Sequence, residues 1–235
     1  MKRLQSTVAI VTGASKGIGK AIARSLAGGG AQVVLAARSL PDLDAAVKEF
    51  QSEGLLATAI AADVTKKTQV DNLVQSAVDT FGRIDILVNN AGMGIFKPLI
   101  DMLPEEFDEM WNVNMRGAFL ATKAVLPHMV KARSGNIVNI CSLAGKNSFT
   151  GGTGYCATKW ALRGFAGSLM LEVRDSNIRV VTIFPGSVDT SFSSTTKRGH
   201  NITQPEDIAD AVVFAVTAPG RSMFSEIDVR PTKPV

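Results

Sequence analysis

Short apolar runs rich in β-branched residues alternate with longer segments of helical periodicity along most of the chain. Most of these runs are continuously apolar, which is typical of parallel strands that are buried on both faces. The predicted strands are Thr7–Thr12, Gln32–Ala37, Leu56–Ala61, Ile84–Asn89, Asn136–Ile140, Arg179–Phe184 and Glu226–Arg230. The predicted helices lie near residues 18–29, 41–53, 67–81, 105–132, 154–175 and 205–217. Before the last helix, Thr203 and Glu206 have the spacing of a capping box, and Pro205 falls near the first helical position.

The alternation of strands and helices predicts an α/β fold. We expect a doubly wound parallel sheet of about seven strands, with right-handed crossovers that place helices on both faces. No linker rich in proline and serine, no low-complexity stretch and no internal repeat divides the 235 residues. The sequence therefore predicts a single domain.

Composition and charge narrow the class of protein. Hydrophobic residues make up 46% of the chain and charged residues 20%, which excludes disorder as the main state. The net charge of +4 is spread along the chain without a basic run, so we expect an anionic ligand but no nucleic-acid partner. Cys141 and Cys156 match no zinc spacing, and no metal is expected. The apolar run Val8–Val11 is too short for a signal peptide or a membrane span, so we expect a cytoplasmic protein without a membrane partner.

A glycine-rich turn joins the first predicted strand to the first predicted helix. Its residues are Thr12, Gly13, Ala14, Ser15, Lys16, Gly17, Ile18 and Gly19. Glycines at such a turn let the backbone approach a pyrophosphate at the positive end of a helix. The spacing is G-x-x-x-G-x-G and not the commoner G-x-G-x-x-G, so by itself the motif also fits a tight turn without a ligand.

The end of the second predicted strand indicates which dinucleotide would bind. A site for NAD usually carries an acidic residue there, but this chain has Ala37 followed by Arg38. The Arg38 guanidinium, with Lys16 nearby, would bind a 2′-phosphate through charge-assisted hydrogen bonds. Such bonds contribute about 1.5–3 kcal/mol each, enough to shift the preference roughly 10- to 100-fold. We therefore expect NADP(H) as the cofactor, the alternative being that Arg38 is a solvated loop residue.

Together with motifs further along, the chain resembles the short-chain dehydrogenases/reductases over nearly its whole length. The residues that carry the resemblance are Thr12-Gly13-x-x-x-Gly17-x-Gly19, Asp63-Val64, Asn89-Asn90-Ala91-Gly92, Asn114, Ser142, Tyr155-x-x-x-Lys159 and Pro185-Gly186. Within that family it is most similar to 3-oxoacyl-carrier-protein reductase-like enzymes and NADPH-dependent carbonyl reductases. The resemblance implies one Rossmann-type domain over residues 1–235, with a cofactor-binding part at about 1–140 and a substrate and catalytic part at about 141–235.

Tyr155 and Lys159 are the pair with the clearest chemistry. They are four residues apart on a predicted helix and therefore share one face. A nearby ammonium would lower the pKa of the phenol and prepare it for proton transfer to a carbonyl oxygen. The resemblance implies that Lys159 also holds the nicotinamide ribose, that Ser142 hydrogen-bonds the substrate carbonyl, and that Asn114 anchors a water relay to Lys159. The alternatives are a packing role for Tyr155 and a helix-surface or capping role for Asn114.

The resemblance also implies further cofactor contacts. They are Asp63 and Val64 for the adenine, Asn90, Ala91 and Gly92 for its ribose, and Pro185, Gly186, Val188 and Thr190 for the nicotinamide and its carboxamide. For Asp63 the alternative is a cap on the next helix. Cys141 and Cys156 flank catalytic positions, and we interpret both as small buried packing residues.

Two segments differ from many relatives. The polar segment from Asp189 to Asn201 is shorter than the usual lid, which predicts a mobile loop, an open pocket and broad tolerance of carbonyl substrates. Within it, Lys197 and Arg198 either meet an anionic substrate or belong to a solvated loop. The end of the chain, Ser225–Val235, lacks the glycine-rich ending of the fatty-acid enzyme, which argues against that pathway and against its tetramer.

The helix at 154–175 predicts self-association, since apolar residues surround most of its circumference. They include Trp160, Leu162, Phe165, Leu169, Met170 and Leu171. One side must pack on the sheet, and the other would be covered if this helix and 105–132 pair across a two-fold axis. We expect at least a dimer, as a homodimer or homotetramer.

The sequence thus favours an NADPH-dependent reductase of a ketone or aldehyde, either 3-oxoacyl-like or a broad range of small carbonyls, with Tyr155 as general acid. One alternative is an NADP-dependent secondary-alcohol dehydrogenase that works oxidatively. Another is a non-catalytic protein that senses NADP, although Ser142, Tyr155 and Lys159 are all present.

Overall fold

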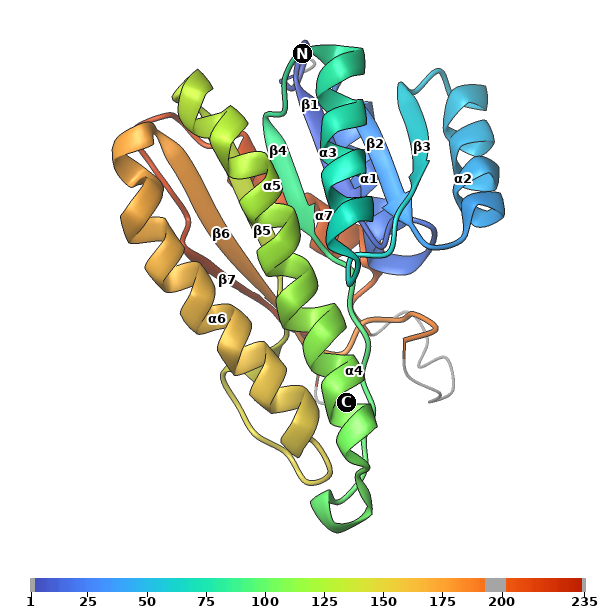
Figure 1. Cartoon of the computed structure of the whole chain (residues 1–235), viewed down its shortest axis with the longest axis vertical. Coiled ribbons are helices and arrows are strands. Elements are labelled where there is room, and N and C mark those ends of the chain that lie inside the picture. The colour runs from blue at the N-terminus through green and yellow to red at the C-terminus, as the bar shows by residue number, and fades with distance from the viewer. Residues whose placement is uncertain (1–2, 193–201, 234–235) are drawn as a thin grey trace.

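Seven parallel strands form one sheet in the computed structural model, which describes residues 3–192 and 202–233. The strands are β1 (Val8–Thr12), β2 (Gln32–Ala37), β3 (Ala57–Ala61), β4 (Ile86–Asn89), β5 (Gly135–Ile140), β6 (Ile178–Pro185) and β7 (Glu226–Val229). Their order in the sheet is β3-β2-β1-β4-β5-β6-β7, and every neighbouring pair is parallel (Figure 1). This is the predicted doubly wound, Rossmann-type α/β fold.

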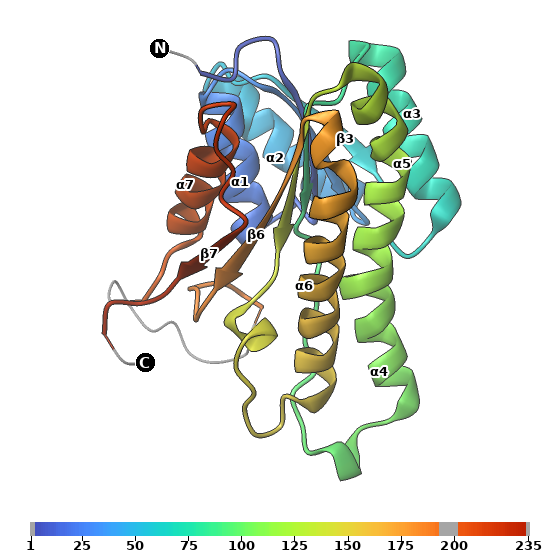
Figure 2. The same ribbon diagram turned by 90° about the vertical axis from the view of Figure 1, so that its left-hand side faces the viewer.

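Helices cover both faces of the sheet. The α-helices are α1 (Gly17–Gly28), α2 (Leu40–Ser52), α3 (Lys67–Phe81), α4 (Pro104–Trp111), α5 (Gly117–Ala132), α6 (Thr153–Val173) and α7 (Pro205–Val216). Short helical turns are η1 (Leu99–Asp101), η2 (Asn112–Arg116), η3 (Leu143–Gly145) and η4 (Arg174–Ser176). In Figure 2, α1, α2 and α7 lie on one face, and α3, α4, α5 and α6 lie on the other.

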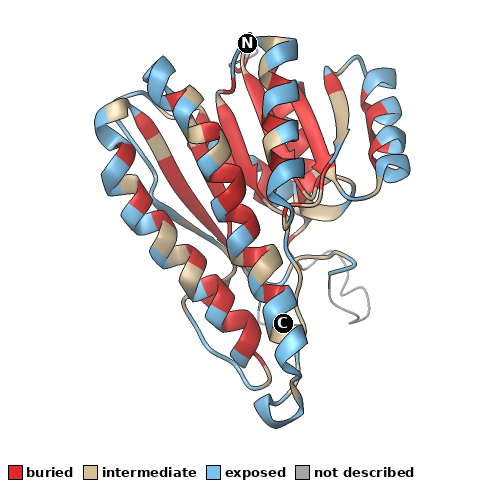
Figure 3. Ribbon diagram, in the orientation of Figure 1, coloured by how far each residue is buried: buried red, intermediate tan, exposed pale blue. Residues whose placement is uncertain are grey.

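Two hydrophobic layers explain why the strands are continuously apolar. Along β1, Ala9 and Val11 pack with α1, α2 and α7, whereas Ile10 between them packs with α3, α5 and α6. Both faces of the central strands are therefore buried, as the red strands of Figure 3 show. Because side chains alternate along a strand, a strand that is covered on both faces favours apolar residues at successive positions. The buried polar residues Asn89 and Asn139 are exceptions and are hydrogen-bonded to each other.

All seven predicted strands are confirmed, and their ends move by at most two residues. The last strand is less buried than the others. In β7, Glu226 and Asp228 are exposed and Ile227 and Val229 are half-buried, because this strand has a neighbour on one side only.

The prediction of a single helix at 105–132 is wrong in one respect. The chain is helical throughout, but a π-helical segment, η2, separates α4 from α5. Asn114 lies within this segment and is buried, with its amide hydrogen-bonded to Met93 and Thr158. The wider turn accommodates this buried polar contact, and π segments of this kind are frequent at functional sites.

The capping box predicted from Thr203 and Glu206 is also wrong by one residue. Helix α7 begins at Pro205, and the Gln204 N–H donates to the Asp207 carboxylate at 2.8 Å. Thr203 is unavailable as a cap because it forms a parallel β-bridge with Val188. That bridge fixes the start of the segment that follows β6.

Candidate active site

A cavity of about 830 Å³ opens at the carboxyl ends of the strands. The cavity lies between the neighbouring strands β1 and β4, whose following connections run to opposite faces of the sheet. Ligands of doubly wound folds usually bind at this position. The predicted site residues that line it are Gly13, Ser15, Lys16, Gly17, Ile18, Gly19, Arg38, Asp63, Val64, Asn90, Ala91, Gly92, Ser142, Tyr155, Lys159, Pro185, Gly186, Val188 and Thr190. Ala14 and Asn114 are buried behind the wall. The structure thus brings nearly all the predicted site residues to one place.

The turn between β1 and α1 is built around the side chain of Asn90. Its Nδ2 donates to the main-chain oxygens of Thr12 at 2.9 Å and Gly13 at 3.1 Å. A Cβ on Gly19 would lie 2.4 Å from this same Nδ2, and Gly13 has a φ of +65°. Only glycine fits these two positions, because one is sterically closed and the other is left-handed.

The N-terminus of α1 faces this cavity. The helix begins at Gly17, and its N-cap residue Lys16 makes no side-chain hydrogen bond to the first turn. Main-chain N–H groups at the start of a helix carry partial positive charge and bind phosphates well. With the glycines removing steric bulk, the turn fits the pyrophosphate of a dinucleotide.

The part of the cavity that is formed by the connections after β1 and β2 carries exposed positive charge. Lys16 and Arg38 are exposed on its lining, and Ala37 occupies the position of the usual acidic residue. Asp63 Oδ1 accepts hydrogen bonds from the main chain and hydroxyl of Thr65 at 2.9 and 2.8 Å. Burial acts to raise the pKa of the Asp63 carboxyl, but these bonds and the charge of Arg38 lower it below its usual value. The carboxylate is therefore ionised at neutral pH and can accept a hydrogen bond.

Tyr155 and Lys159 lie on the first turns of α6, and both side chains are buried. Lys159 Nζ donates to the main-chain oxygen of Ile140 at 3.1 Å and lies 5.7 Å from the centre of the Tyr155 ring. Ser142 follows β5, and its Oγ accepts from the Ala144 N–H at 3.1 Å. This bond orients Ser142 at the start of η3, where it lines the same cavity as Tyr155.

The predicted lowering of the Tyr155 pKa is wrong for this structure. Burial raises the pKa of the phenol well above its usual value, and the hydrogen bond with Ser142 offsets only part of that rise. Burial also lowers the pKa of Lys159, whose ammonium is held by a main-chain carbonyl and not against the phenol. The ring of Tyr155 packs in an apolar cluster with Met110, which accounts for the desolvation. Tyr155 is therefore protonated at neutral pH and is suited to donate a proton.

Asn114 ties three segments together behind the cavity. Its Oδ1 accepts from the Met93 N–H at 2.8 Å, and its Nδ2 donates to the Met93 carbonyl at 2.8 Å and to Thr158 Oγ1 at 3.0 Å. Thr158 immediately precedes Lys159, so the amide links the segment after β4 to the catalytic turn of α6. The predicted water relay through Asn114 stays a prediction.

The sequence analysis missed an aromatic part of the wall. Phe96, Phe149 and Phe192 come from three separate loops and line the cavity. Phe96 and Phe192 lie against Tyr155, and Phe149 lies against Phe96. No periodicity relates loop residues, so the only available signal was the presence of large apolar side chains in segments predicted to be exposed.

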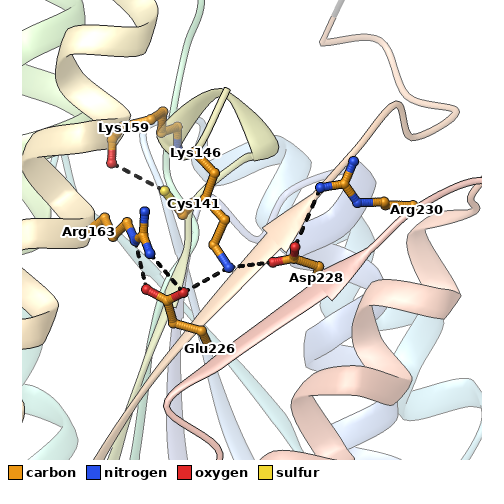
Figure 4. A network of polar contacts seen from close by, with 7 residues as sticks. All are labelled: Cys141, Lys146, Lys159, Arg163, Glu226, Asp228 and Arg230. Atoms are coloured by element: carbon orange, nitrogen blue, oxygen red, sulfur yellow. Dashed lines mark hydrogen bonds and ion pairs between the residues drawn. The ribbon is translucent and has the colours of Figure 1, made fainter. Parts of the chain in front are cut away.

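A network of ion pairs supports the wall from the side of β7 (Figure 4). Lys146, directly after η3, contacts Glu226 at 2.8 Å and Asp228 at 2.7 Å. Arg163 on α6 contacts Glu226 at 2.7 Å. The hydrogen bond from Lys146 lowers the pKa of the Asp228 carboxyl, so both acidic residues are charged at neutral pH. Strand β7 thereby joins the loop that carries Ser142 to the helix that carries Tyr155.

Cys141 and Cys156 are buried, as the interpretation of both as packing residues requires. Burial raises the pKa of the Cys141 thiol, and its Sγ lies 3.3 Å from the Lys159 carbonyl (Figure 4). Of the predicted lid, the structure describes residues 189–192. Lys197 and Arg198 lie outside the described residues.

Among the described residues, no cluster of three or more histidine, cysteine, aspartate or glutamate side chains is placed to bind a metal ion. No helix in the described ranges combines the length and the apolar character that a membrane crossing requires.

Comparison with known proteins places this site in a family. The family model described as short chain dehydrogenase matches residues 7–201. An uncharacterized oxidoreductase of Staphylococcus epidermidis is 36% identical over 232 residues, which cover 98% of this chain and 100% of that protein. Another, from Staphylococcus saprophyticus, is 38% identical over 234 residues with the same coverage.

Two solved structures are similar over the whole fold. A metagenomic short-chain oxidoreductase in complex with NADP has a TM-score of 0.88 and 39% identity, over 99% of this chain and 100% of that one. An alcohol dehydrogenase from the archaeon Thermococcus sibiricus, complexed with 5-hydroxy-NADP, has a TM-score of 0.90 and 34% identity, over 97% and 99%. With its sheet order, its glycine turn and these matches along nearly its full length, the chain belongs to the short-chain dehydrogenase family of oxidoreductases.

Proposed function

We propose that this protein is an NADP(H)-dependent oxidoreductase that reduces the carbonyl group of a ketone or aldehyde to an alcohol. The observation that carries the proposal is the position of Tyr155, a buried and protonated phenol beside Ser142 and Lys159 in the cavity that the glycine turn also lines. The NADP and 5-hydroxy-NADP of the two similar structures support the choice of cofactor.

The chain supplies groups suited to each part of that cofactor. The turn from Gly13 to Gly19 would hold the pyrophosphate, and Arg38 with Lys16 would hold a 2′-phosphate. The remaining proposed contacts are those of Asp63 and Val64 with the adenine, of Asn90, Ala91 and Gly92 with its ribose, and of Pro185, Gly186, Val188 and Thr190 with the nicotinamide. In this proposal, residues from about 1 to 140 bind the cofactor, and residues from about 141 to 235 form the substrate-binding and catalytic part.

In the proposed reaction, Ser142 donates a hydrogen bond to the substrate carbonyl oxygen and holds it beside the phenol of Tyr155. Bound NADPH supplies the hydride that adds to the carbonyl carbon. Tyr155 transfers its proton to the oxygen as negative charge develops there, which completes the alcohol. The ammonium of Lys159, 5.7 Å from the ring centre, stabilises the phenolate that this transfer leaves. A proton from solvent then restores Tyr155.

The direction of the Tyr155 pKa shift predicts how the reaction depends on pH. Because its pKa is raised, the phenol stays protonated between about pH 6 and 9, and kcat/KM for carbonyl reduction should be level across that range. Alcohol oxidation needs the phenolate, so its kcat/KM should climb with pH without a plateau below about pH 9. Initial rates in both directions against pH measure this, and a loss of reductase activity centred near neutral pH would show that the phenol is not the acid.

Cofactor choice provides a second expected result. Arg38→Asp should lower kcat/KM for NADPH by about 10- to 100-fold and raise the preference for NADH, because a carboxylate repels the 2′-phosphate that the guanidinium binds. Arg174→Asp is a matched control, since it makes the same charge change on η4, outside the cavity lining. Equal effects of the two substitutions would mean that net charge, and not Arg38, determines the preference.

The proposal itself is tested by following NADPH consumption with a panel of ketones and aldehydes. The expected result is turnover with NADPH for at least one class of carbonyl and slower turnover with NADH. Tight binding of NADPH without turnover of any carbonyl would contradict the reductase and favour a sensor.

We also propose that the protein is a homo-oligomer, at least a dimer. On α6, Trp160 and Leu171 are exposed on the same side as Gly164 and Gly167, and Phe119 is exposed on the neighbouring α5. Two such helices from a second copy would bury this apolar surface. Light scattering should give at least twice the mass of 24.8 kDa, and Leu171→Glu should reduce it to that mass. A monomeric native protein would contradict this proposal of an oligomer. The cytoplasmic location expected from the sequence stays a prediction.

A further inference from the structure

Three phenylalanine rings from separate parts of the chain form one cluster beside Tyr155. Phe96 lies between β4 and η1, Phe149 between η3 and α6, and Phe192 in the segment after β6. Each lines the cavity and remains 44–47% exposed, although a phenyl ring is normally buried in a core. Large apolar rings that stay exposed in a concave site indicate a ligand with an apolar surface.

The rings form a connected aromatic cluster around the phenol. Phe96 meets Tyr155 edge-on, with centroids 5.2 Å apart and an interplanar angle of 77°. Phe192 lies 6.0 Å from Tyr155 and 6.4 Å from Phe96, and Phe149 lies 5.9 Å from Phe96. These separations fall in the range in which aromatic rings attract one another in tilted and edge-to-face arrangements.

Two glycines, Gly94 and Gly152, leave room for the phenyl rings. A Cβ on Gly94 would lie 2.6 Å from the tip of Phe96 and 3.2 Å from the ring of Phe192. A Cβ on Gly152 would lie 2.6–2.8 Å from three atoms of the Phe149 ring. All three rings therefore rest directly against main chain, which a loop with ordinary side chains would prevent.

The lining of the cavity beside the phenylalanine cluster favours an uncharged ligand. Besides the phenylalanines, Met93 and Leu143 line the wall near Tyr155 and Ser142. Four of the charged lining residues come from the connections after β1, β2 and β3; they are Lys16, Arg38, Asp42 and Asp63. Lys159 also lines the cavity, and its ammonium donates to the main-chain oxygen of Ile140 at 3.1 Å. Asp189 also lines the cavity, after β6, and its carboxylate disfavours an anionic substrate there.

We propose that the Phe96–Phe149–Phe192 cluster binds a planar aromatic ring attached to the reacting carbonyl, so that aryl ketones and aryl aldehydes are the preferred substrates. This inference rests on the proposed reductase function and narrows it. A substrate ring placed among these side chains presents its face to their edges, with the carbonyl oxygen toward Ser142 and Tyr155. Each favourable ring pair contributes about a 2- to 12-fold preference over a saturated ring of the same size.

The test compares methyl phenyl ketone with methyl cyclohexyl ketone, which have equal numbers of carbon atoms and differ in aromaticity. Because the two ketones differ in intrinsic reactivity, the quantity to measure is the ratio of their kcat/KM values with NADPH in the native protein and in the variants. In Phe96→Leu and Phe192→Leu this ratio should fall by about 2- to 12-fold. Phe214→Leu is the control, since Phe214 is an exposed aromatic residue on α7, paired with Phe224 away from this cavity; its ratio should equal that of the native protein.

The outcomes separate this inference from the function on which it rests. An unchanged ratio in both cluster variants, with melting temperatures near the native value, overturns the aromatic site. Reduction of straight-chain aldehydes with no turnover of either ring-bearing ketone also overturns it and leaves the reductase intact. Absence of NADPH consumption with every carbonyl overturns the proposed function, and the inference with it. Competitive inhibition of aldehyde reduction by benzyl alcohol, stronger than that by cyclohexylmethanol in the native protein only, would support the site independently.

Discussion

Replacing Tyr155 by phenylalanine is expected to lower kcat/KM for carbonyl reduction by about 100- to 10,000-fold. The phenyl ring fills the same space among Phe96, Phe192 and Met110 but carries no proton to donate. Without that proton, only the hydrogen bond from Ser142 stabilises the negative charge that develops on the carbonyl oxygen. Initial rates of NADPH consumption with a single good substrate measure the effect.

The loss in this variant should be confined to the chemical step. Tyr155 is buried, and the substitution removes its hydroxyl but leaves the apolar packing unchanged, so the melting temperature should change little. The dissociation constant of NADPH, followed by its fluorescence, should stay close to the native value. Ser142→Ala is the companion variant, and it should be less damaging because the proton donor remains. Activity in Tyr155→Phe close to the native level would exclude the phenol as the acid.

The fold was predictable because buried parallel strands leave a strong pattern. In β1, every residue from Val8 to Thr12 is buried, since layers of helices cover both faces. A strand in the middle of such a sheet is therefore mostly apolar, and its alternation with helical segments indicates the crossover topology. Ends of elements were less predictable: the fourth strand was predicted from Ile84 but begins at Ile86, and the seventh was predicted to end at Arg230 but ends at Val229.

The features that escaped prediction depend on contacts between distant residues. The spacing of Tyr155 and Lys159 predicts that they share a helix face, but it does not tell how deeply the phenol is buried. Burial is what raises the pKa of Tyr155, and it reverses the shift expected from the lysine alone. Likewise Phe96 and Phe192, far apart in the sequence, become neighbours only through the sheet order.

Asn114 was identified through a family resemblance, and its structural surroundings predict the second large effect. Asn114→Ala is expected to lower the free energy of unfolding by about 2–4 kcal/mol. The substitution removes the partners of both the N–H and the carbonyl of Met93. A buried polar group left without a partner costs about 1–3 kcal/mol, and because Met93 is only half-buried, each of its two groups falls in the lower part of that range. In a chain of this size that loss corresponds to a decrease in melting temperature of about 4–16 °C. Thermal unfolding followed by circular dichroism measures it.

The same substitution should also lower kcat/KM at least about 10-fold at temperatures where the variant is folded. A Cβ built on Gly92 would lie 3.7 Å from Lys159 Nζ, so release of Met93 frees the segment that packs against the catalytic lysine. Thr158→Val is the companion variant. It removes the Asn114–Thr158 hydrogen bond, and with it the bond from Thr158 Oγ1 to the Tyr155 main-chain oxygen, and it leaves both bonds to Met93 in place. It should cost about 1 kcal/mol and less activity. If the two variants were equal in stability and rate, the link from α6 to Thr158, and not the tether on Met93, would be what Asn114 contributes to the site.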